Sequence, residues 1–219
     1  MNTFNKAILF DMDGVVLDSE KLYTKAEIKL FGEYGVEIPE EDWALFRGCS
    51  ENEFFNKSMK RYNIKEDKAV FMKKGRRYVK REFEENLNYM PGFKDLHSMV
   101  IRNYKTALVT ASPKHNLNWV RTIIDLDCYF ENILSGEETS KNKPHPEPYL
   151  EMMFRLNVKP SNTIIIEDSL NGIHAGLKSG AFVIAKTGSV PTKELSIAHK
   201  IVSSLNEINK NLIEELLQK

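Results

Sequence analysis

Cysteine is scarce in this 219-residue chain, which contains only Cys49 and Cys128. Two cysteines so placed have neither the spacing of a metal-binding site nor the density of a disulfide framework. Small folds held together by disulfides or structural zinc are therefore excluded. A disulfide between the two stays open, and we expect reduced thiols in a cytosolic protein.

The chain also lacks net charge and long apolar runs. Its 31 basic and 31 acidic residues balance, so no bulk charge draws it to nucleic acid or to an anionic membrane. The apolar run at residues 7–10 is too short for a signal peptide, and no later stretch is long enough to cross a bilayer. We expect a soluble, cytoplasmic monomer that binds neither nucleic acid nor membrane.

Short apolar runs alternate with longer helix-like stretches along the chain. Five runs predict β-strands: residues 7–10, 106–109, 163–166, 181–184 and 201–202. Their continuous hydrophobicity is typical of strands that are buried on both faces of a parallel sheet. The intervening helical stretches fit the crossovers that parallel strands need. The sequence therefore predicts an α/β fold with a parallel sheet.

Helix signals are explicit at three places. Ser112 is expected to cap a helix with Pro113 at its first position. Ser169 is expected to cap a helix that ends at Gly180. Residues 50–53 have the form of a capping box, which predicts a helix start there.

Residues 20 to 85 differ from the rest, because they are highly charged and show no strand pattern. We interpret this stretch as a helical insertion after the first strand. The alternative is a set of extra helices packed on one continuous domain.

Polar residues follow each of the first three apolar runs. They are Asp11-Met12-Asp13-Gly14, Thr110-Ala111-Ser112 and Glu167-Asp168-Ser169. Ligands of open parallel sheets bind outside the carboxyl ends of the strands, so these side chains could converge on one site. Asp11, Asp13 and Asp168 would then offer the oxygen ligands that Mg²⁺ prefers. Read singly, each acid could instead cap a helix or lie solvated at a loop end.

Four segments together resemble the motifs of a known family. The segment Asp11–Val15 resembles the first motif of the haloacid dehalogenase-like superfamily. Thr110, Lys143-Pro144, and Glu167–Ser169 with Gly172 are similar to its second, third and fourth motifs, in the same order. The resemblance covers essentially the whole chain, and it is greatest to the subgroup of β-phosphoglucomutase and small sugar-phosphate phosphatases.

This resemblance implies a fold and a domain organisation. Residues 1–17 and 88–219 would form a doubly wound, Rossmann-like α/β core. Residues 18–87 would form a helical cap domain inserted after the first motif.

The resemblance also implies roles for the acidic residues. Asp11 would be the nucleophile and would carry an aspartyl-phosphate. Asp13 would protonate the leaving oxygen and then activate water. The Asp11 carboxylate, the Asp13 backbone carbonyl and Asp168 would bind Mg²⁺, and Glu167 would support the metal without binding it directly.

The resemblance further implies that residues of the second and third motifs bind phosphate. Thr110 and Lys143 would hold phosphoryl oxygens, aided by Ala111 and Ser112 at a helix N-terminus. For Ser112 the alternative is simple helix capping, and for Lys143 it is an ordinary solvated lysine.

The insertion contains further candidates for substrate binding. Arg47 and Gly48 resemble part of the subgroup's substrate-specificity loop, and the alternative is an ordinary loop before a helix. Lys74 shares a helix face with Arg77 and Arg81, which could meet a second phosphate or could simply be solvated.

Two positions depart from the family pattern. Tyr23 stands where β-phosphoglucomutases typically carry a histidine, and Asn142 replaces the glycine that often precedes the lysine of the third motif. The sequence predicts an Mg²⁺-dependent phosphatase acting on a small phosphorylated metabolite, with a sugar phosphate expected. The alternatives are a β-phosphoglucomutase-type phosphomutase and a non-catalytic sensor that keeps the fold.

Overall fold

The structure, a computed structural model, describes residues 4–39, 42–46 and 51–218. Its backbone contacts divide the chain into two compact units. Residues 1–18 and 88–219 form one, which we name the sheet unit, and residues 19–87 form the other, the helical unit.

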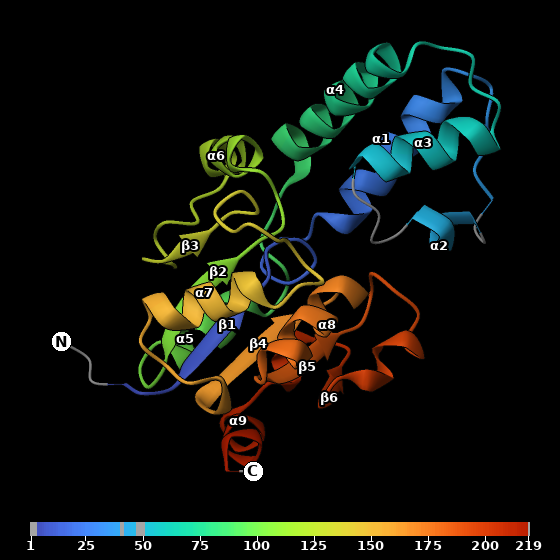
Figure 1. The fold of residues 1–219 in the computed structure, drawn as a ribbon. Helices are drawn as coiled ribbons and strands as arrows, with labels where there is room; N and C mark the ends of the chain where they lie inside the picture. Colours follow the sequence, from blue (N-terminus) through green and yellow to red (C-terminus); the bar gives the residue numbers. More distant parts are fainter. Residues whose placement is uncertain (1–3, 40–41, 47–50, 219) are drawn as a thin grey trace. The chain divides into compact units, whose positions relative to one another are not determined.

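A six-stranded parallel sheet forms the centre of the sheet unit (Figure 1). Its strands are β1 (Ala7–Phe10), β2 (Lys105–Val109), β3 (Ile133–Leu134), β4 (Thr163–Glu167), β5 (Phe182–Lys186) and β6 (Lys200–Val202). The strand order is β3-β2-β1-β4-β5-β6, and every neighbouring pair is parallel. The predicted α/β fold with a doubly wound parallel sheet is confirmed. Strand β3, with two residues, was not predicted.

Helices cover both faces of this sheet. They are α5 (Phe93–Val100), α6 (Lys114–Ile123), α7 (Glu147–Arg155), α8 (Leu170–Ser179) and α9 (Lys210–Leu217), with short 3₁₀ turns at Pro160–Asn162, Glu194–Ile197 and Leu205–Glu207. Helices α7 and α8 bury their apolar residues with Leu9 and Ile165 on one face. On the other face Phe10 contacts Phe93 of α5, with ring centroids 5.9 Å apart. Both faces of β1 are therefore apolar, which explains its unbroken hydrophobic sequence.

The helical unit consists of α1 (Glu20–Gly32), α2 (Trp43–Phe46), α3 (Glu51–Arg61) and α4 (Lys68–Asn86). Its core is aromatic, and Phe31 and Phe71 lie at its centre with their ring centroids 5.4 Å apart. The described residues of this unit contain no strand, as the sequence predicts.

Two of the three predicted helix signals agree with the structure. Ser169 caps α8 by accepting from the Gly172 N–H over 3.1 Å, and Gly180 ends this helix with φ of 83°. Helix α3 begins at Glu51, although the proposed capping residue Ser50 lies outside the described residues. The prediction that Ser112 caps α6 is wrong. Pro113 is the N-cap, because its extended ψ of 152° delays the helix to Lys114.

Two expectations from composition can be compared with the fold. Within the part of the chain that the structure describes, no helix is long and apolar enough to span a membrane. Cys128 is an exposed free thiol. Cys49 lies outside the described residues, so the structure does not decide between a disulfide and two thiols.

Candidate active site

The site is built at the carboxyl ends of β1, β2 and β4. Phe10 is in register with Leu108 of β2 and with Ile166 of β4. The residues that follow, Asp11 among them, therefore lie level with each other at the sheet edge, and the Asp11 N–H still donates to Ile166 O over 3.0 Å. The chain continues from β1 to β2 on one side and later enters β4 on the other, so this edge is a topological switch point.

The Lys143 ammonium lies at the centre of the site. Its side chain is 3% exposed, and it donates to Asp11 Oδ1 at 2.5 Å, Glu167 Oε1 at 2.8 Å and Val109 O at 2.9 Å. An ammonium has three donors, so all of them are in use. Burial alone would lower the pKa of Lys143, but the charges of Asp11 and Glu167 outweigh burial and hold it well above its usual range. Lys143 is thus a buried cation, and the alternative of a solvated lysine is wrong.

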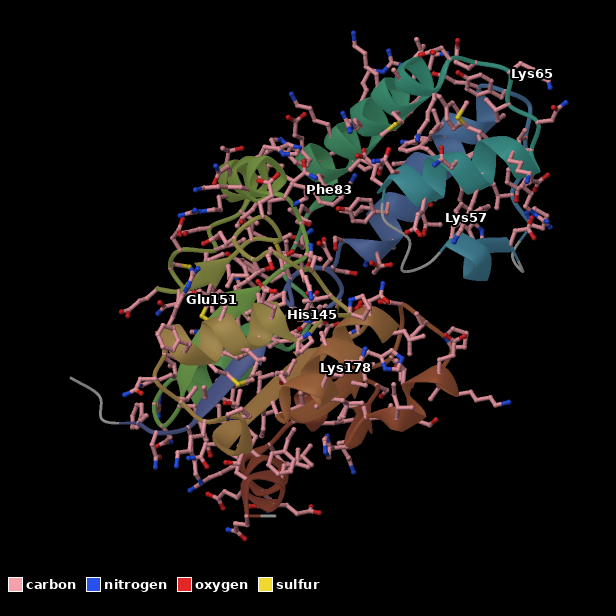
Figure 2. All side chains as sticks on the ribbon, viewed as in Figure 1. Lys57, Lys65, Phe83, His145, Glu151 and Lys178 are labelled. Atoms are coloured by element: carbon pink, nitrogen blue, oxygen red, sulfur yellow. The ribbon has the colours of Figure 1, made fainter. Side chains whose placement is uncertain are left out.

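Lys143 reaches this position from the loop that precedes α7. Two residues further along that loop is His145, which Figure 2 labels. The prolines of this loop prevent it from continuing as a helix or a central strand. The direction of the Lys143 side chain is therefore set by its three hydrogen-bond acceptors.

Glu167 connects the residues around it. Its Oε1 accepts from Lys143 and from the hydroxyl of Tyr149, the latter at 2.8 Å. Its Oε2 accepts from the Asp168 N–H, the Ser169 N–H and the Ser169 hydroxyl at 2.9 to 3.1 Å. Burial raises the pKa of Glu167, but the Lys143 charge and these hydrogen bonds bring it below its usual value. Because two carboxylate oxygens have about four acceptor positions, these five donors leave Glu167 little capacity to bind a metal directly.

Asp168 is held by residues from two other loops. The Ser189 hydroxyl donates to its Oδ2. Gly14, with φ of 75°, lies so close that a Cβ there would be 1.7 Å from the same oxygen. Only glycine fits this position, because it tolerates the positive φ and allows the close approach.

Asp11 completes a group of three buried carboxylates. Asp11, Glu167 and Asp168 each offer an oxygen within 4.8 Å of the others. Burial raises the pKa of Asp11 to about 8, with the Lys143 charge opposing this and the Glu167 charge adding to it. Among the described residues, no hydrogen bond reaches Asp11 Oδ2.

This arrangement fits a divalent cation. Three carboxylates lie together and only Asp11 and Glu167 pair with the Lys143 ammonium. Burial, with a smaller contribution from the Glu167 charge, raises the pKa of Asp11, and a bound cation would favour its charged form. A hard cation such as Mg²⁺ is bound by one or two carboxylates plus water and phosphate oxygens. Since Glu167 is occupied by its five donors, Asp11 and Asp168 are the carboxylates that could hold the metal.

The loop after β2 lies beside the second acid of the first motif. Asp13 is half-buried, and the Ser112 hydroxyl lies 3.5 Å from its Oδ2. Thr110 is buried, and its Oγ1 accepts from the Ser112 N–H at 3.0 Å. The Thr110 hydroxyl proton is therefore left to donate elsewhere.

The candidates from the insertion are not placed in the site. Arg47 and Gly48 lie outside the described residues. Lys74 belongs to the helical unit, where it donates to Tyr34 Oη at 2.7 Å and to Glu66 at 3.3 Å. Its role in phosphate binding stays a prediction.

Sequence reasoning did not identify three contributors. Tyr149 has the pattern of an ordinary core residue of a helix. Ser189 lies in a loop without a motif, and Asn142 reads only as a small change beside Lys143. Their contacts join segments far apart in the chain, so no local signal could have revealed them.

Comparisons with known proteins identify the family. The family model described as haloacid dehalogenase-like hydrolase matches residues 8–186. A phosphorylated carbohydrates phosphatase of Thermotoga maritima is 33% identical over 80% of this chain and 82% of that protein. Hexitol phosphatase B of Escherichia coli is 27% identical over 92% of this chain and 93% of that protein.

Solved structures agree as well. A β-phosphoglucomutase from Clostridium difficile superposes with a TM-score of 0.77 at 28% identity, covering 97% of each chain. The chain belongs to the haloacid dehalogenase-like hydrolase family. It is thus an enzyme of the hydrolase class.

Proposed function

We propose that the protein is an Mg²⁺-dependent phosphatase that hydrolyses a small phosphorylated metabolite, most simply a sugar phosphate. One observation carries this proposal: the buried Asp11 has one carboxylate oxygen fixed by Lys143, while no described residue bonds to the other. Relatives named as a phosphorylated carbohydrates phosphatase and a hexitol phosphatase support the choice of substrate class.

The metal would be held by the carboxylates of Asp11 and Asp168 and by the backbone carbonyl of Asp13. When bound, Mg²⁺ would supply positive charge that offsets the charge of the transferring phosphoryl group. Ser189 and Gly14 fix Asp168 on the side of Oδ2. Contacts of this kind orient a metal ligand without touching the metal.

The first half of the reaction transfers the phosphoryl group to the enzyme. Asp11 Oδ2 attacks phosphorus, and the bond from phosphorus to the ester oxygen breaks. Asp13, in its protonated form, gives its proton to the leaving oxygen, so the metabolite departs as a neutral alcohol. Asp11 then carries an acyl phosphate.

The second half regenerates the enzyme. Asp13, now a carboxylate, takes a proton from a water molecule whose oxygen attacks phosphorus. The bond between phosphorus and Asp11 Oδ2 breaks, inorganic phosphate is released, and Asp11 is restored. Asp13 ends the cycle protonated, as it began.

Lys143 and Thr110 act mainly by position and charge. Because all three Lys143 protons already have acceptors, a phosphoryl oxygen reaches this ammonium only by replacing one of them. We infer that Lys143 chiefly orients Asp11 and places positive charge beside the phosphoryl group, while the Thr110 hydroxyl donates to a phosphoryl oxygen.

The helical unit would serve as the cap domain that excludes water during the transfer. Tyr23 of α1 packs its ring on Phe83, labelled in Figure 2, with centroids 5.0 Å apart. A tyrosine has no imidazole, so Tyr23 does not supply the histidine expected of a β-phosphoglucomutase. The likeness to a β-phosphoglucomutase structure nevertheless makes a phosphomutase the second candidate.

A panel of sugar phosphates and other phosphorylated metabolites, incubated with Mg²⁺, tests the proposal. Release of inorganic phosphate supports a phosphatase, whereas isomer formation without phosphate release would replace it with the phosphomutase. Absence of any turnover would favour a non-catalytic protein. The isosteric Asp11→Asn variant should stay folded and lose nearly all turnover, and near-normal activity would remove Asp11 as the nucleophile.

A further inference from the structure

Asn142 joins two segments of the site that lie far apart in the sequence. Its side-chain Oδ1 accepts from the Lys143 N–H at 2.8 Å, and its Nδ2 donates to Ala111 O at 3.1 Å. The orientation of this amide is determined, because a flipped amide would place donor against donor and acceptor against acceptor. One half-buried side chain thus connects the lysine of the third motif with the segment Thr110–Ser112, which we name the β2 loop.

The β2 loop is held from a second direction by Gly136. The Gly136 N–H donates to Ser112 O at 2.9 Å. A Cβ on Gly136 would lie 2.3 Å from Ala111 O and 2.5 Å from Asn142 Nδ2. Both carbonyl groups, of Ala111 and of Ser112, are therefore engaged by donors from the segment that follows β3.

These contacts fix both ends of Lys143. Its ammonium is held by Asp11, Glu167 and Val109 O, and its backbone N–H is held by Asn142. The same Asn142 side chain fixes the carbonyl next to Thr110. The distance between the buried cation and the Thr110 hydroxyl is therefore set partly through Asn142.

We propose that Asn142 is a positioning residue that ties the Lys143 backbone to the β2 loop and so sets the spacing between the Lys143 charge and the Thr110 hydroxyl on which phosphate binding depends. This inference rests on the proposed function, since it assigns Lys143 and Thr110 to phosphate. Asn142 is uncharged and makes no hydrogen bond to Asp11 or Asp168. The Lys143 ammonium that orients Asp11 is also held by Glu167 and Val109 O, so we expect the loss of Asn142 to act on phosphate affinity and not on metal affinity.

The test compares Asn142→Ala with the wild type in the presence of Mg²⁺. Each lost hydrogen bond is worth about 1 kcal/mol, or roughly fivefold. We expect KM and the dissociation constant of inorganic phosphate, measured by calorimetry, to rise by about 5- to 30-fold. The Mg²⁺ concentration for half-maximal activity should not change. A purely structural role would lower the melting temperature without moving either phosphate constant, and that result overturns the proposal.

Two further variants sharpen the result. Asn142→Asp keeps the acceptor for the Lys143 N–H but has no donor for Ala111 O, so it should bind phosphate no better than Asn142→Ala. Wild-type affinity in Asn142→Asp would overturn the tie to the β2 loop. As a matched control, Asn162→Ala removes a similar bond, to Asn5 O at 3.1 Å, at the opposite end of β4. It should leave phosphate affinity unchanged.

Thr110→Val tests whether Asn142 acts through the β2 loop. If it does, the double variant Asn142→Ala/Thr110→Val should bind phosphate about as weakly as Thr110→Val alone. If the two single-variant losses of phosphate affinity multiply fully in the double variant, Asn142 does not act through the β2 loop, and the inference is overturned. A wild type that hydrolyses no ester but binds inorganic phosphate would refute the proposed function, while calorimetry on the variants would still decide the role of Asn142. A wild type that does not bind phosphate at all would overturn both.

Discussion

The hydroxyl of Tyr149 donates to Glu167 Oε1, the same oxygen that accepts from the Lys143 ammonium. The Tyr149 side chain is fully buried, and the ammonium lies 4.8 Å above the centre of its ring. Burial and the Glu167 charge both raise the pKa of Tyr149 well above its usual value, so it stays a neutral donor. Tyr149 thus stabilises the Lys143–Glu167 pair through its hydroxyl and its ring together.

Replacing Tyr149 by phenylalanine keeps the ring and removes the hydroxyl. We expect the free energy of unfolding to fall by about 2 kcal/mol, because the lost bond is to a buried charge. Urea denaturation measures this loss. Tyr89→Phe is the control, since the Tyr89 hydroxyl donates to Asp125 O in an exposed setting. An equal fall in the free energy of unfolding in the two variants would show that the hydrogen bond to Glu167 stabilises the fold no more than an exposed one does.

Gly14→Ala should damage the proposed metal site beyond its effect on the backbone. The new Cβ would lie 1.7 Å from Asp168 Oδ2, so the carboxylate must move. Gly35→Ala is a matched control with φ of 67° and no atom within 4 Å of its Cβ. Both variants should lose about 1–2 kcal/mol of stability from the strained φ. Only Gly14→Ala should raise the Mg²⁺ concentration for half-maximal activity, by about tenfold or more, and an unchanged Mg²⁺ requirement would contradict the placement of Asp168.

Lys143→Met should destabilise the fold as well as abolish activity. It leaves Asp11 and Glu167 buried without their cation, and breaking one side of a buried ion pair costs about 3–5 kcal/mol. Lys105→Met is the comparison, because the Lys105 ammonium donates to the Leu156 carbonyl oxygen instead of to a carboxylate. Chemical denaturation of both variants tests this. A loss for Lys143→Met no larger than that for Lys105→Met would indicate that Glu167 is not an ionised partner of Lys143 in the native state.

The stability of the metal-free protein should depend on pH through Asp11. Its pKa is raised from an ordinary 3.8 to about 8 in the folded state. Between these values the folded protein binds more protons than the unfolded chain, so the free energy of unfolding falls as pH rises. Glu167 has a lowered pKa, and its contribution is lost only as pH falls below its ordinary 4.5, outside this window.

Urea denaturation in chelator, in steps from about pH 5 to about pH 8.5, measures this slope. Asp11→Asn should make it shallower, because the amide does not titrate, and the slope that remains comes from Glu27, whose pKa burial also raises to about 8. Added Mg²⁺ should remove the part due to Asp11 by favouring its charged carboxylate. The same slope in the wild type and in Asp11→Asn would assign the titration to another group.

The fold was readable from the sequence because its strands are locally encoded. Ile164 to Ile166 and Ala7 to Phe10 are apolar on both faces, and an acid follows each run at the end of its strand. The edge strand β3 escaped detection because its two residues, Ile133 and Leu134, make no pattern. Ser112 was misassigned because a serine before a proline matches a helix cap, whereas here Pro113 is extended and takes that place itself.

The acidic residues of the site could be predicted from the sequence, but the residues that hydrogen-bond to them could not. Asp11, Glu167 and Asp168 follow buried strands, so topology alone brings them together. Tyr149 and Asn142 act through hydrogen bonds to segments that the sequence does not place beside them. Glu167 accepts hydrogen bonds from five donors, which leaves it little capacity to bind a metal. These contacts depend on side-chain geometry and could be seen only in the structure.

The parallel pairing of β1 with β4 has a consequence for how the protein is made. Asp11 is translated well before its N–H acceptor, Ile166, and before Asp168, which lies beside it in the site. A nascent polypeptide therefore holds Asp11, the proposed nucleophile, without its partners in the site until β4 has been translated. Hydrolytic activity can arise only after β4 has been released and inserted beside β1.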